Sequence, residues 1–234
     1  MGKNKLRRFA EMKTQSCVFE PDKQLLLDDQ FEMKGKWDSF FGNSNPITIE
    51  LGCGKGEYTL ALAKKYPGRN FVGVDVKGAR IWRGSKTAED ESIPNVAFVR
   101  TKIEFINQIF AENEVSEIWL TFSDPQPKDK KGTKRLSGWA FLKRYGKLMK
   151  PESIINIKTD SQFFYDSTLE TIEKGEHTLI RSKDDIYGIH WEDFHPDDQE
   201  ILSVKTFYEK KWLAIGKKIK FLQFKLNDEY YKAV

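Results

Sequence analysis

The chain has 234 residues, of which 39% are hydrophobic and 13% aromatic, and this suits one large domain with a packed core. It has no apolar run of about 18 residues, so no transmembrane helix is predicted, and its basic N-terminus lacks the apolar stretch of a secretory signal. Cys17 and Cys53 lie in unrelated contexts. This pattern favours a reducing compartment, the cytoplasm, over a disulfide framework.

The net charge is only +4, but the charges are segregated along the chain. Residues 128–144 hold seven basic side chains and one acid, and residues 205–225 hold seven lysines and one acid. Residues 184–200 hold seven acids and no Lys or Arg. This segregation indicates a basic face for a polyanion such as nucleic acid. Solvated helix faces explain the same lysines, and charge alone does not choose between the two interpretations.

The predicted elements begin after a basic N-terminal extension at residues 1–45, and residues 46–234 form a single domain of alternating strand and helix patterns. Strands are predicted at 47–51, 70–75, 96–100, 117–122, 153–158, 178–182 and 219–226. Helices are predicted at 58–66, 77–89, 103–112, 137–149 and 161–174. Right-handed crossovers between such strands predict a Rossmann-like α/β fold, with a seven-stranded, mostly parallel sheet and helices on both faces.

The first strand ends in a glycine turn, Ile47-Thr-Ile-Glu-Leu-Gly-Cys-Gly-Lys-Gly56, and the second ends in Asp75. A dinucleotide fingerprint would have a third glycine where this chain has Glu57, and a P-loop would end in G-K-[ST]. A carboxylate at a helix start also repels phosphate. A cationic nucleoside without phosphate fits better, and S-adenosylmethionine is such a ligand. Glu50 would favour its positive charge, and Asp75 would accept hydrogen bonds from its ribose. A strand–turn–helix with incidental acids remains the alternative.

The fourth strand ends in a second motif, Phe122-Ser-Asp-Pro-Gln-Pro-Lys128, which delivers Asp124 to the same sheet edge as Glu50 and Asp75. Two prolines stiffen the backbone beyond it. A basic run follows at once and includes Lys134 and Arg135. Asp124 beside a methyl-donor site is a candidate for chemistry. Alternatively, it only caps a turn ahead of proline, as Asp often does.

Together with Lys158-Thr-Asp160 and Thr206-Phe-Tyr-Glu209, these two motifs resemble the bacterial tRNA (guanine-N7-)-methyltransferases over roughly residues 45–226. The glycine turn is shared by many methyltransferases, whereas the segment at 122–128 with its basic tail is far more specific. The resemblance implies a class I S-adenosylmethionine-dependent methyltransferase fold. It also implies that the chain modifies guanine 46 in the variable loop of tRNA.

The resemblance also implies roles for individual residues. The methyl-donor residues would be Glu50, Gly52, Gly54, Gly56, Asp75 and Asp124, and the substrate-binding residues would be Lys128, Asp160, Thr206, Phe207, Tyr208 and Glu209. Independently of the resemblance, the basic residues Lys134, Arg135, Arg7 and Arg8 are expected to contact RNA phosphates, and the N-terminal arm is expected to be disordered until RNA binds. The chain departs from the family at Gln126, where a tryptophan is usual, and at Lys102, which stands where an adenine-contacting residue is usual.

Guanine N7 carries a lone pair and no proton, so its methylation needs no general base. Holding N7 in line with the methyl group should supply most of the catalysis, and a nearby carboxylate can stabilise the cationic product. Asp124 is the first choice for that carboxylate and Asp160 the second. Glu209 or Asp160 could accept both donors of the guanine edge. Thr206 and Glu209 also match a helix capping box, which is the simpler explanation of that pair.

Two other functions stay open on the sequence: methylation of another acceptor, such as a protein amine or a small molecule, and RNA binding without catalysis. His190 and His195 have the wrong spacing for a helical metal pair, so no metal is expected. The sequence does not distinguish a monomer from a homodimer.

Overall fold

The structure is a computed structural model that describes residues 2–188 and 194–232. His190 therefore lies outside the described residues. By their contacts, the residues group into two compact units, Met1–Val115 and Ser116–Val234. Among the described helices, none is long and apolar enough to cross a membrane.

The first unit is built on four parallel strands in the order β1-β4-β3-β2. The strands are β1 Val18–Phe19, β2 Ile47–Leu51, β3 Asn70–Asp75 and β4 Val96–Arg100. Every residue of β2 and β3 is buried. This is the pattern of a parallel sheet covered on both faces. The register pairs Glu50 with Gly73 and Asp75 with Arg100, and thereby sets the carboxyl ends of β2 and β3 side by side.

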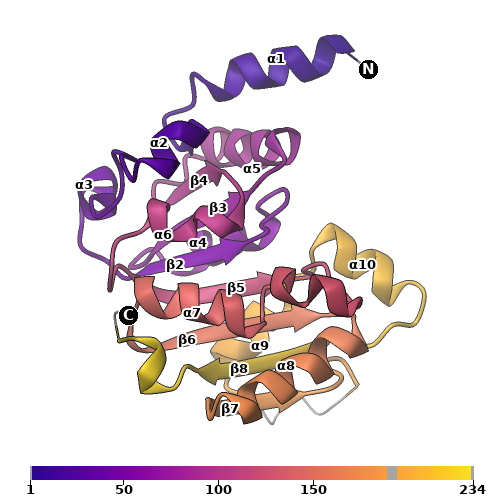
Figure 1. Ribbon diagram of the computed structural model, residues 1–234. Coiled ribbons are helices and arrows are strands. Elements are labelled where there is room, and N and C mark those ends of the chain that lie inside the picture. Colours follow the sequence, from indigo (N-terminus) through magenta and orange to yellow (C-terminus); the bar gives the residue numbers. More distant parts are fainter. Residues whose placement is uncertain (1, 189–193, 233–234) are drawn as a thin grey trace. The chain divides into compact units, whose positions relative to one another are not determined.

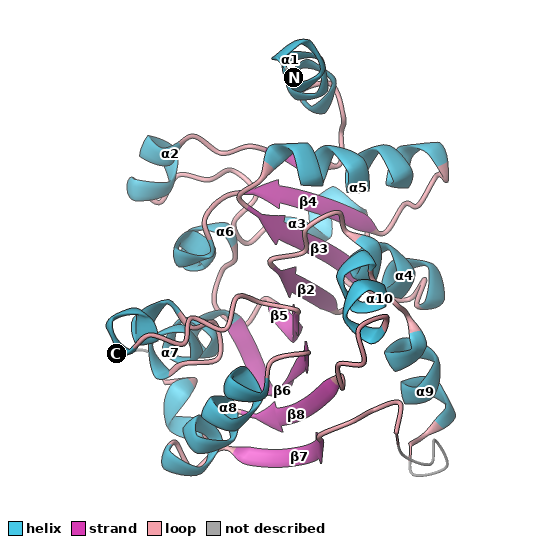
Figure 2. Cartoon of the chain, turned by 90° about the vertical axis from the view of Figure 1, so that its right-hand side faces the viewer, coloured by secondary structure: helices cyan, strands magenta, loops and turns pink. Residues whose placement is uncertain are grey.

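Helices α4 Glu57–Lys65 and α5 Gly78–Asp90 pack against these strands. The short α6 Ile106–Ile109 lies across the strands from α4 (Figure 2). The helix predicted at 103–112 is wrong in form: it is a 3₁₀ turn, Ile103–Phe105, followed by α6. Two more short helices, α2 Lys23–Leu27 and α3 Trp37–Phe41, complete the unit.

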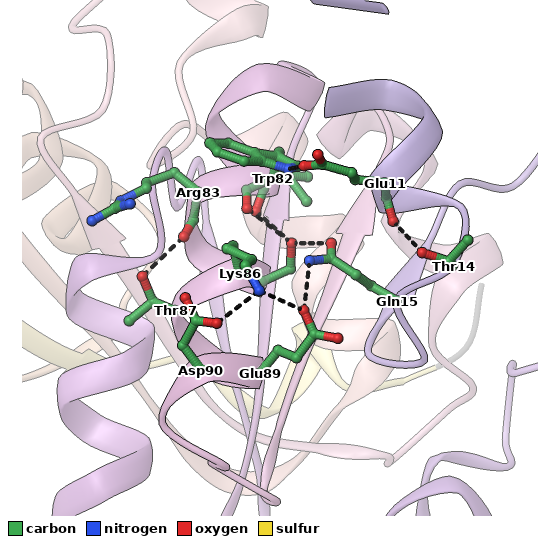
Figure 3. Close-up of polar contacts among 11 residues, drawn as sticks. Glu11, Thr14, Gln15, Trp82, Arg83, Lys86, Thr87, Glu89 and Asp90 are labelled. Atoms are coloured by element: carbon green, nitrogen blue, oxygen red, sulfur yellow. Dashed lines mark hydrogen bonds and ion pairs between the residues drawn. The ribbon is translucent and has the colours of Figure 1, made fainter. Parts of the chain in front are cut away.

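The N-terminal arm is a helix, α1 Gly2–Met12, which packs on α5. The Trp82 indole donates to Glu11 (2.7 Å), as Figure 3 shows. The Ser85 hydroxyl donates to Gln15 (2.6 Å). Arg8 stacks on Trp82, with its guanidinium carbon 4.5 Å from the ring centre. The expectation of a disordered arm is therefore wrong, because aromatic and polar contacts on α5 order it.

The second unit contains four strands in the order β5-β6-β8-β7. They are β5 Val115–Thr121, β6 Met149–Thr159, β7 Thr178–Lys183 and β8 Lys220–Lys225, and β8 runs antiparallel to both β6 and β7. The helices are α7 Trp139–Leu148, α8 Gln162–Lys174, α9 Pro196–Ser203 and α10 Phe207–Leu213. Figures 1 and 2 show α7 and α8 on one side of these strands and α9 on the other.

The described residues thus form eight strands, one more than the seven predicted. The addition is β1, whose two residues pair with Phe98 and Val99 of β4. A two-residue strand has no periodicity of its own, so its sequence gave no signal.

Candidate functional site

The residues expected at the methyl donor lie at the carboxyl ends of β2 and β3 and in the turn that follows β2. Glu50, the fourth residue of β2, is only 3% exposed. One of its oxygens accepts hydrogen bonds from the backbone N–H of Thr59 (2.9 Å) and from the Thr59 hydroxyl. Thr59 is in the first turn of α4, where backbone N–H groups have no partner within the helix. Glu50 therefore ties the start of α4 to the end of β2 and holds a negative charge beside the glycine turn.

The glycine turn depends on backbone conformations that side chains disfavour. Gly52, Gly54 and Gly56 have φ of +81°, +59° and +69°. A Cβ on Gly52 or Gly54 would meet nothing within 4 Å, whereas one on Gly56 would lie 2.6 Å from the Phe98 ring. The first two glycines thus leave their side of the turn open to a ligand, and the third allows the turn to pack closely on the sheet.

Asp75 holds the glycine turn and the start of the next segment with both carboxylate oxygens. Oδ2 accepts the N–H of Gly54 (2.9 Å), and Oδ1 accepts the N–H of Lys77 (2.7 Å). Each carboxylate oxygen has a further lone pair, so the group can still accept a hydroxyl. Burial, with Glu50 and Asp75 adding to it, raises the pKa of the Cys53 thiol well above its usual value. Cys53 is consequently a packing residue of the turn and not a nucleophile.

Asp124 lies in a strained loop of the second unit. Phe122 and Gln126, two residues before and after it, have φ of +51° and +45°. Asp124 accepts the N–H of Gln126 (3.1 Å), so the turn-capping role is present. The Asp124 side chain is nonetheless exposed and can also meet a substrate. The loop is held from outside, because the Phe122 N–H donates to the Lys158 carbonyl (2.8 Å) and Arg135 donates to the Gln126 carbonyl (3.3 Å).

Asp160 follows the end of β6 and accepts a hydrogen bond from Lys217 (2.5 Å). The ammonium of Lys217 also lies 3.9 Å from the centre of the Trp212 ring. The Asp160 side chain is 15% exposed and its partner's is 40% exposed, so this pair lies at the surface rather than in the core.

The Thr206–Glu209 element is the start of α10, and the capping box predicted from the sequence is confirmed. Phe207 and Tyr208 are 53% and 41% exposed, with their rings edge to face at 5.6 Å. Glu209 differs from them, because it is 0% exposed. The element therefore presents two aromatic side chains to solvent and turns its carboxylate into the unit.

The comparisons with known proteins agree along nearly the whole chain. Residues 44–222 match a family described as "Putative methyltransferase". A curated protein of Christiangramia forsetii, named tRNA (guanine-N(7)-)-methyltransferase, is 48% identical over 227 residues, which cover 97% of this chain and 99% of that protein. One of the same name from Bacteroides thetaiotaomicron is 47% identical, over 98% of this chain and 88% of that protein. The chain belongs to the tRNA (guanine-N7)-methyltransferase family.

Solved structures support the methyltransferase fold of this family member. The crystal structure of the 16S rRNA methyltransferase KamB matches with a TM-score of 0.60 at 13% identity, covering 82% of this chain and 93% of that one. At this identity the likeness concerns the fold alone. The predicted Rossmann-like class is confirmed, with the one additional strand described above.

The basic residues assigned to RNA in this methyltransferase fall into two groups. Lys128 and Lys134 are exposed, and Arg7 is exposed although it pairs with Glu11 at 3.3 Å. Arg8 and Arg135 are partly buried and stack on Trp82 and Phe163, respectively. Their guanidinium groups thus also hold local structure. Of the lysines in 205–225, Lys220 is buried and does not belong to a basic surface.

Three residues of the second unit, Trp139, Phe163 and Lys158, received no role from the sequence, and the structure shows their surroundings. Trp139 and Phe163 are 57% and 39% exposed, and Phe163 carries the Arg135 guanidinium on its ring at 4.8 Å. Lys158 is completely buried and pairs with Glu209. Aromatic residues are usually buried and lysines are usually exposed, so residue type alone predicts the opposite of what the structure shows at these three positions.

Proposed function

We propose that this chain transfers a methyl group from S-adenosylmethionine to N7 of guanine 46 in the variable loop of tRNA. The observation that carries the proposal is the near full-length similarity to proteins named tRNA (guanine-N(7)-)-methyltransferase, at 48% and 47% identity. One alternative is a methyltransferase that acts on another acceptor, and it stays open because Gln126 stands where the family usually has tryptophan. The other is a relative that binds RNA without catalysis. The chain keeps Glu50, the three glycines, Asp75 and Asp124, and a protein that only binds RNA would not need them all.

The residues expected at the methyl donor fit S-adenosylmethionine. Glu50 supplies a buried negative charge beside the turn, where the ligand's ammonium and sulfonium groups need one. Gly52 and Gly54 leave space where a side chain would stand, and Asp75 keeps lone pairs for ribose hydroxyls. Lys102, which stands where the family usually has an adenine-contacting residue, is exposed, and we assign its side chain no contact with the adenine of S-adenosylmethionine. The ligand supplies an electrophilic methyl group on its sulfonium.

The reaction needs no proton transfer. The N7 lone pair of guanine forms the new carbon–nitrogen bond as the sulfur–carbon bond breaks, and the sulfur keeps that bonding pair. Positive charge thus moves to the purine, where a carboxylate stabilises it. Asp124 is assigned this role because it is exposed, and its strained loop is held from both ends. The rest of the catalysis is alignment of N7 with the methyl group.

Guanine recognition falls to an acidic side chain that the base can reach. Asp160 is partly exposed and its partner Lys217 is more so, which leaves that carboxylate accessible to the N1 and N2 donors of guanine. We assign the guanine edge to Asp160 and not to Glu209, whose oxygens are enclosed. Phe207 and Tyr208 can stack on bases of the variable loop, and Lys128, Lys134, Arg135, Arg7 and Arg8 can meet phosphates.

The domain boundaries are part of the proposal: residues 46–234 act as one methyltransferase domain, and residues 1–45 are its basic extension. The family match at 44–222, which crosses both compact units, supports a single functional domain. We place the protein in the cytoplasm with its tRNA substrate.

The test is methyl transfer from labelled S-adenosylmethionine to unmodified tRNA, with a tRNA that carries adenine at position 46 as the matched control. The proposal expects label only in the first tRNA, and chain scission at that position after borohydride and aniline treatment. Donor binding without label in any tRNA would overturn it in favour of another acceptor.

A further inference from the structure

Lys158, near the end of β6, is a lysine with no exposed side-chain surface. Its ammonium pairs with Glu209 Oε1 (2.7 Å) and donates to the carbonyls of Leu202 (2.6 Å) and Val204 (3.0 Å). Leu202 belongs to α9, Val204 to the connection that follows it, and Glu209 to α10. One ammonium group therefore gathers three successive parts of the chain around the end of β6.

Glu209 is enclosed by the same group of contacts. Oε1 also accepts the Tyr187 hydroxyl (2.6 Å), and Oε2 accepts the Thr206 N–H (3.3 Å). The Tyr187 hydroxyl also lies 3.2 Å from the Leu202 carbonyl, which shares its one proton as the weaker acceptor, and the Lys205 ammonium lies 4.7 Å from the Tyr187 ring centre. Both oxygens are thus satisfied inside the unit, and the side chain is 0% exposed.

The backbone of Lys158 reaches the other motif of this unit. Its carbonyl accepts the Phe122 N–H (2.8 Å), two residues before Asp124 in the strained loop. Asp160 follows two residues later. A displacement of Lys158 would consequently move the Asp124 loop, Asp160 and the start of α10 together.

A buried ion pair is a poor source of stability, because desolvation of the two charges often exceeds their attraction, and hydrophobic residues of similar volume do as well or better. The best-attested use of such a pair is to fix one arrangement of the chain. Burial lowers the pKa of Lys158 to about 8, and the Glu209 carboxylate opposes this effect. The ammonium form at neutral pH is thus sustained by its partner.

We propose that Lys158 is a positioning residue for the acceptor site: through Glu209, Leu202 and Val204 it holds the start of α10, with Phe207 and Tyr208, in fixed relation to the Asp124 loop and Asp160. Glu209 acts through this pair and does not touch guanine. The inference rests on the proposed tRNA methylation and deepens it. The resemblance alone had placed Glu209 at the substrate.

The test compares Lys158→Met, Glu209→Gln and the double variant with wild type, and it uses Lys220→Met as the matched control. Lys220 is also buried, on the strand paired with β6, but its ammonium meets only the Lys218 carbonyl among its described hydrogen-bond partners, at 3.4 Å. The readouts are kcat and KM for tRNA, S-adenosylmethionine affinity by calorimetry, and the circular dichroism spectrum.

For Lys158→Met we expect a loss of roughly 100-fold in kcat/KM for tRNA, since a small displacement of aligned groups has that effect, with donor affinity unchanged. The double variant leaves no buried charge, and the amide oxygen introduced by Glu209→Gln can take the place of Oε1 and still accept from Tyr187, so that only the 3.3 Å bond from the Thr206 N–H is lost. It should therefore recover most of the loss. Lys220→Met should behave as wild type. If Lys158→Met does not fold, the inference is tested by the kinetics of the double variant alone, which should be active.

Wild-type kinetics for Lys158→Met would overturn the inference. So would a double variant that folds and binds the donor but is as inactive as Glu209→Gln alone, because the Glu209 carboxylate would then be needed in its own right. Absence of tRNA methylation in wild type and Lys220→Met would instead refute the proposed function. The two failures are therefore distinguishable.

Discussion

The backbone N–H of Gly54 donates to the carboxylate of Asp75 over 2.9 Å, which joins the glycine turn after β2 to the acidic end of β3. The second oxygen of Asp75 holds the N–H of Lys77 at 2.7 Å. The donor motif is therefore one hydrogen-bonded unit, in which the turn and the carboxylate hold each other in place. Such preorganisation lowers the ordering cost of binding a ligand.

Two glycines of this motif, Gly54 and Gly56, should respond differently to alanine. Gly54→Ala should cost about 1–2 kcal/mol, because its left-handed backbone disfavours a Cβ, and should weaken donor binding. Gly56→Ala should cost more, since it adds a Cβ 2.6 Å from the Phe98 ring to the same backbone strain. Thermal unfolding and calorimetry with S-adenosylmethionine measure both effects. Gly68→Ala is the control, because that Cβ meets nothing within 4 Å. Equal unfolding temperatures for Gly54→Ala and Gly56→Ala would contradict this account.

Substitutions of Asp124 can separate its charge from its turn-capping bond. Asp124→Asn keeps an oxygen for the Gln126 N–H, which Asp124 accepts at 3.1 Å, but removes the charge. We expect kcat to fall about 100-fold in this variant, as for the loss of one stabilising group at a charge-developing centre. Asp124→Ala should be no more active and should keep the fold, because the side chain is exposed. An active Asp124→Asn beside an inactive Asp124→Ala would reduce the residue to a turn cap.

Lys134 and Arg135 are neighbours with different surroundings, and their variants should differ accordingly. Lys134→Ala should raise the KM for tRNA and reduce the slope of log KM against log salt by about 0.7–0.9, with kcat unchanged. Arg135→Ala should also lower kcat, because Arg135 donates to the Gln126 carbonyl at 3.3 Å and stacks on Phe163. The double variant should raise KM and flatten the salt dependence. An unchanged salt slope in all three would remove this run from the RNA surface.

His177 predicts a pH dependence of stability. Burial lowers the pKa of His177 to about 4, while Nδ1 accepts the Asn227 N–H at 3.0 Å. The unfolded chain takes up the proton near pH 6.5 and the folded one only near pH 4. This residue's contribution is therefore present above pH 6.5 and is lost as the pH falls through that window. Between pH 7 and pH 5, wild type should lose roughly 2–4 °C more in unfolding temperature than His177→Gln, which keeps an acceptor and does not titrate. Parallel losses in the two proteins would contradict the assignment.

The strands and the glycine turn of the first unit could be predicted from sequence almost residue by residue. The bounds predicted for β2, β3 and β4, 47–51, 70–75 and 96–100, are those of the structure. The signals are local: short apolar, β-branched runs end in glycine or an acid, and the turn requires glycine at left-handed positions. The capping box at Thr206 and Glu209 is equally local, because both partners lie within one helical turn.

Which side chains of the second unit are buried, and which of them pair, could not be predicted in this way. The contact between Lys158 and Glu209 joins elements far apart in the chain, and neither segment carries a signal for the other. Trp139 is exposed although it is aromatic. The same limit applies to the N-terminal arm, which is ordered because Trp82 and Ser85 of α5 receive it.

The sequence by itself determined the fold class, the glycine turn with its acidic strand ends, and the family, because each rests on residue types at short, fixed spacings. Only the tertiary structure decided which charges face solvent and which face each other. Asp124 and Asp160 keep exposed surface, whereas Glu209 is enclosed with Lys158. The physical reason is that the environment of a charged side chain depends on the residues packed around it, and these come from distant parts of the chain.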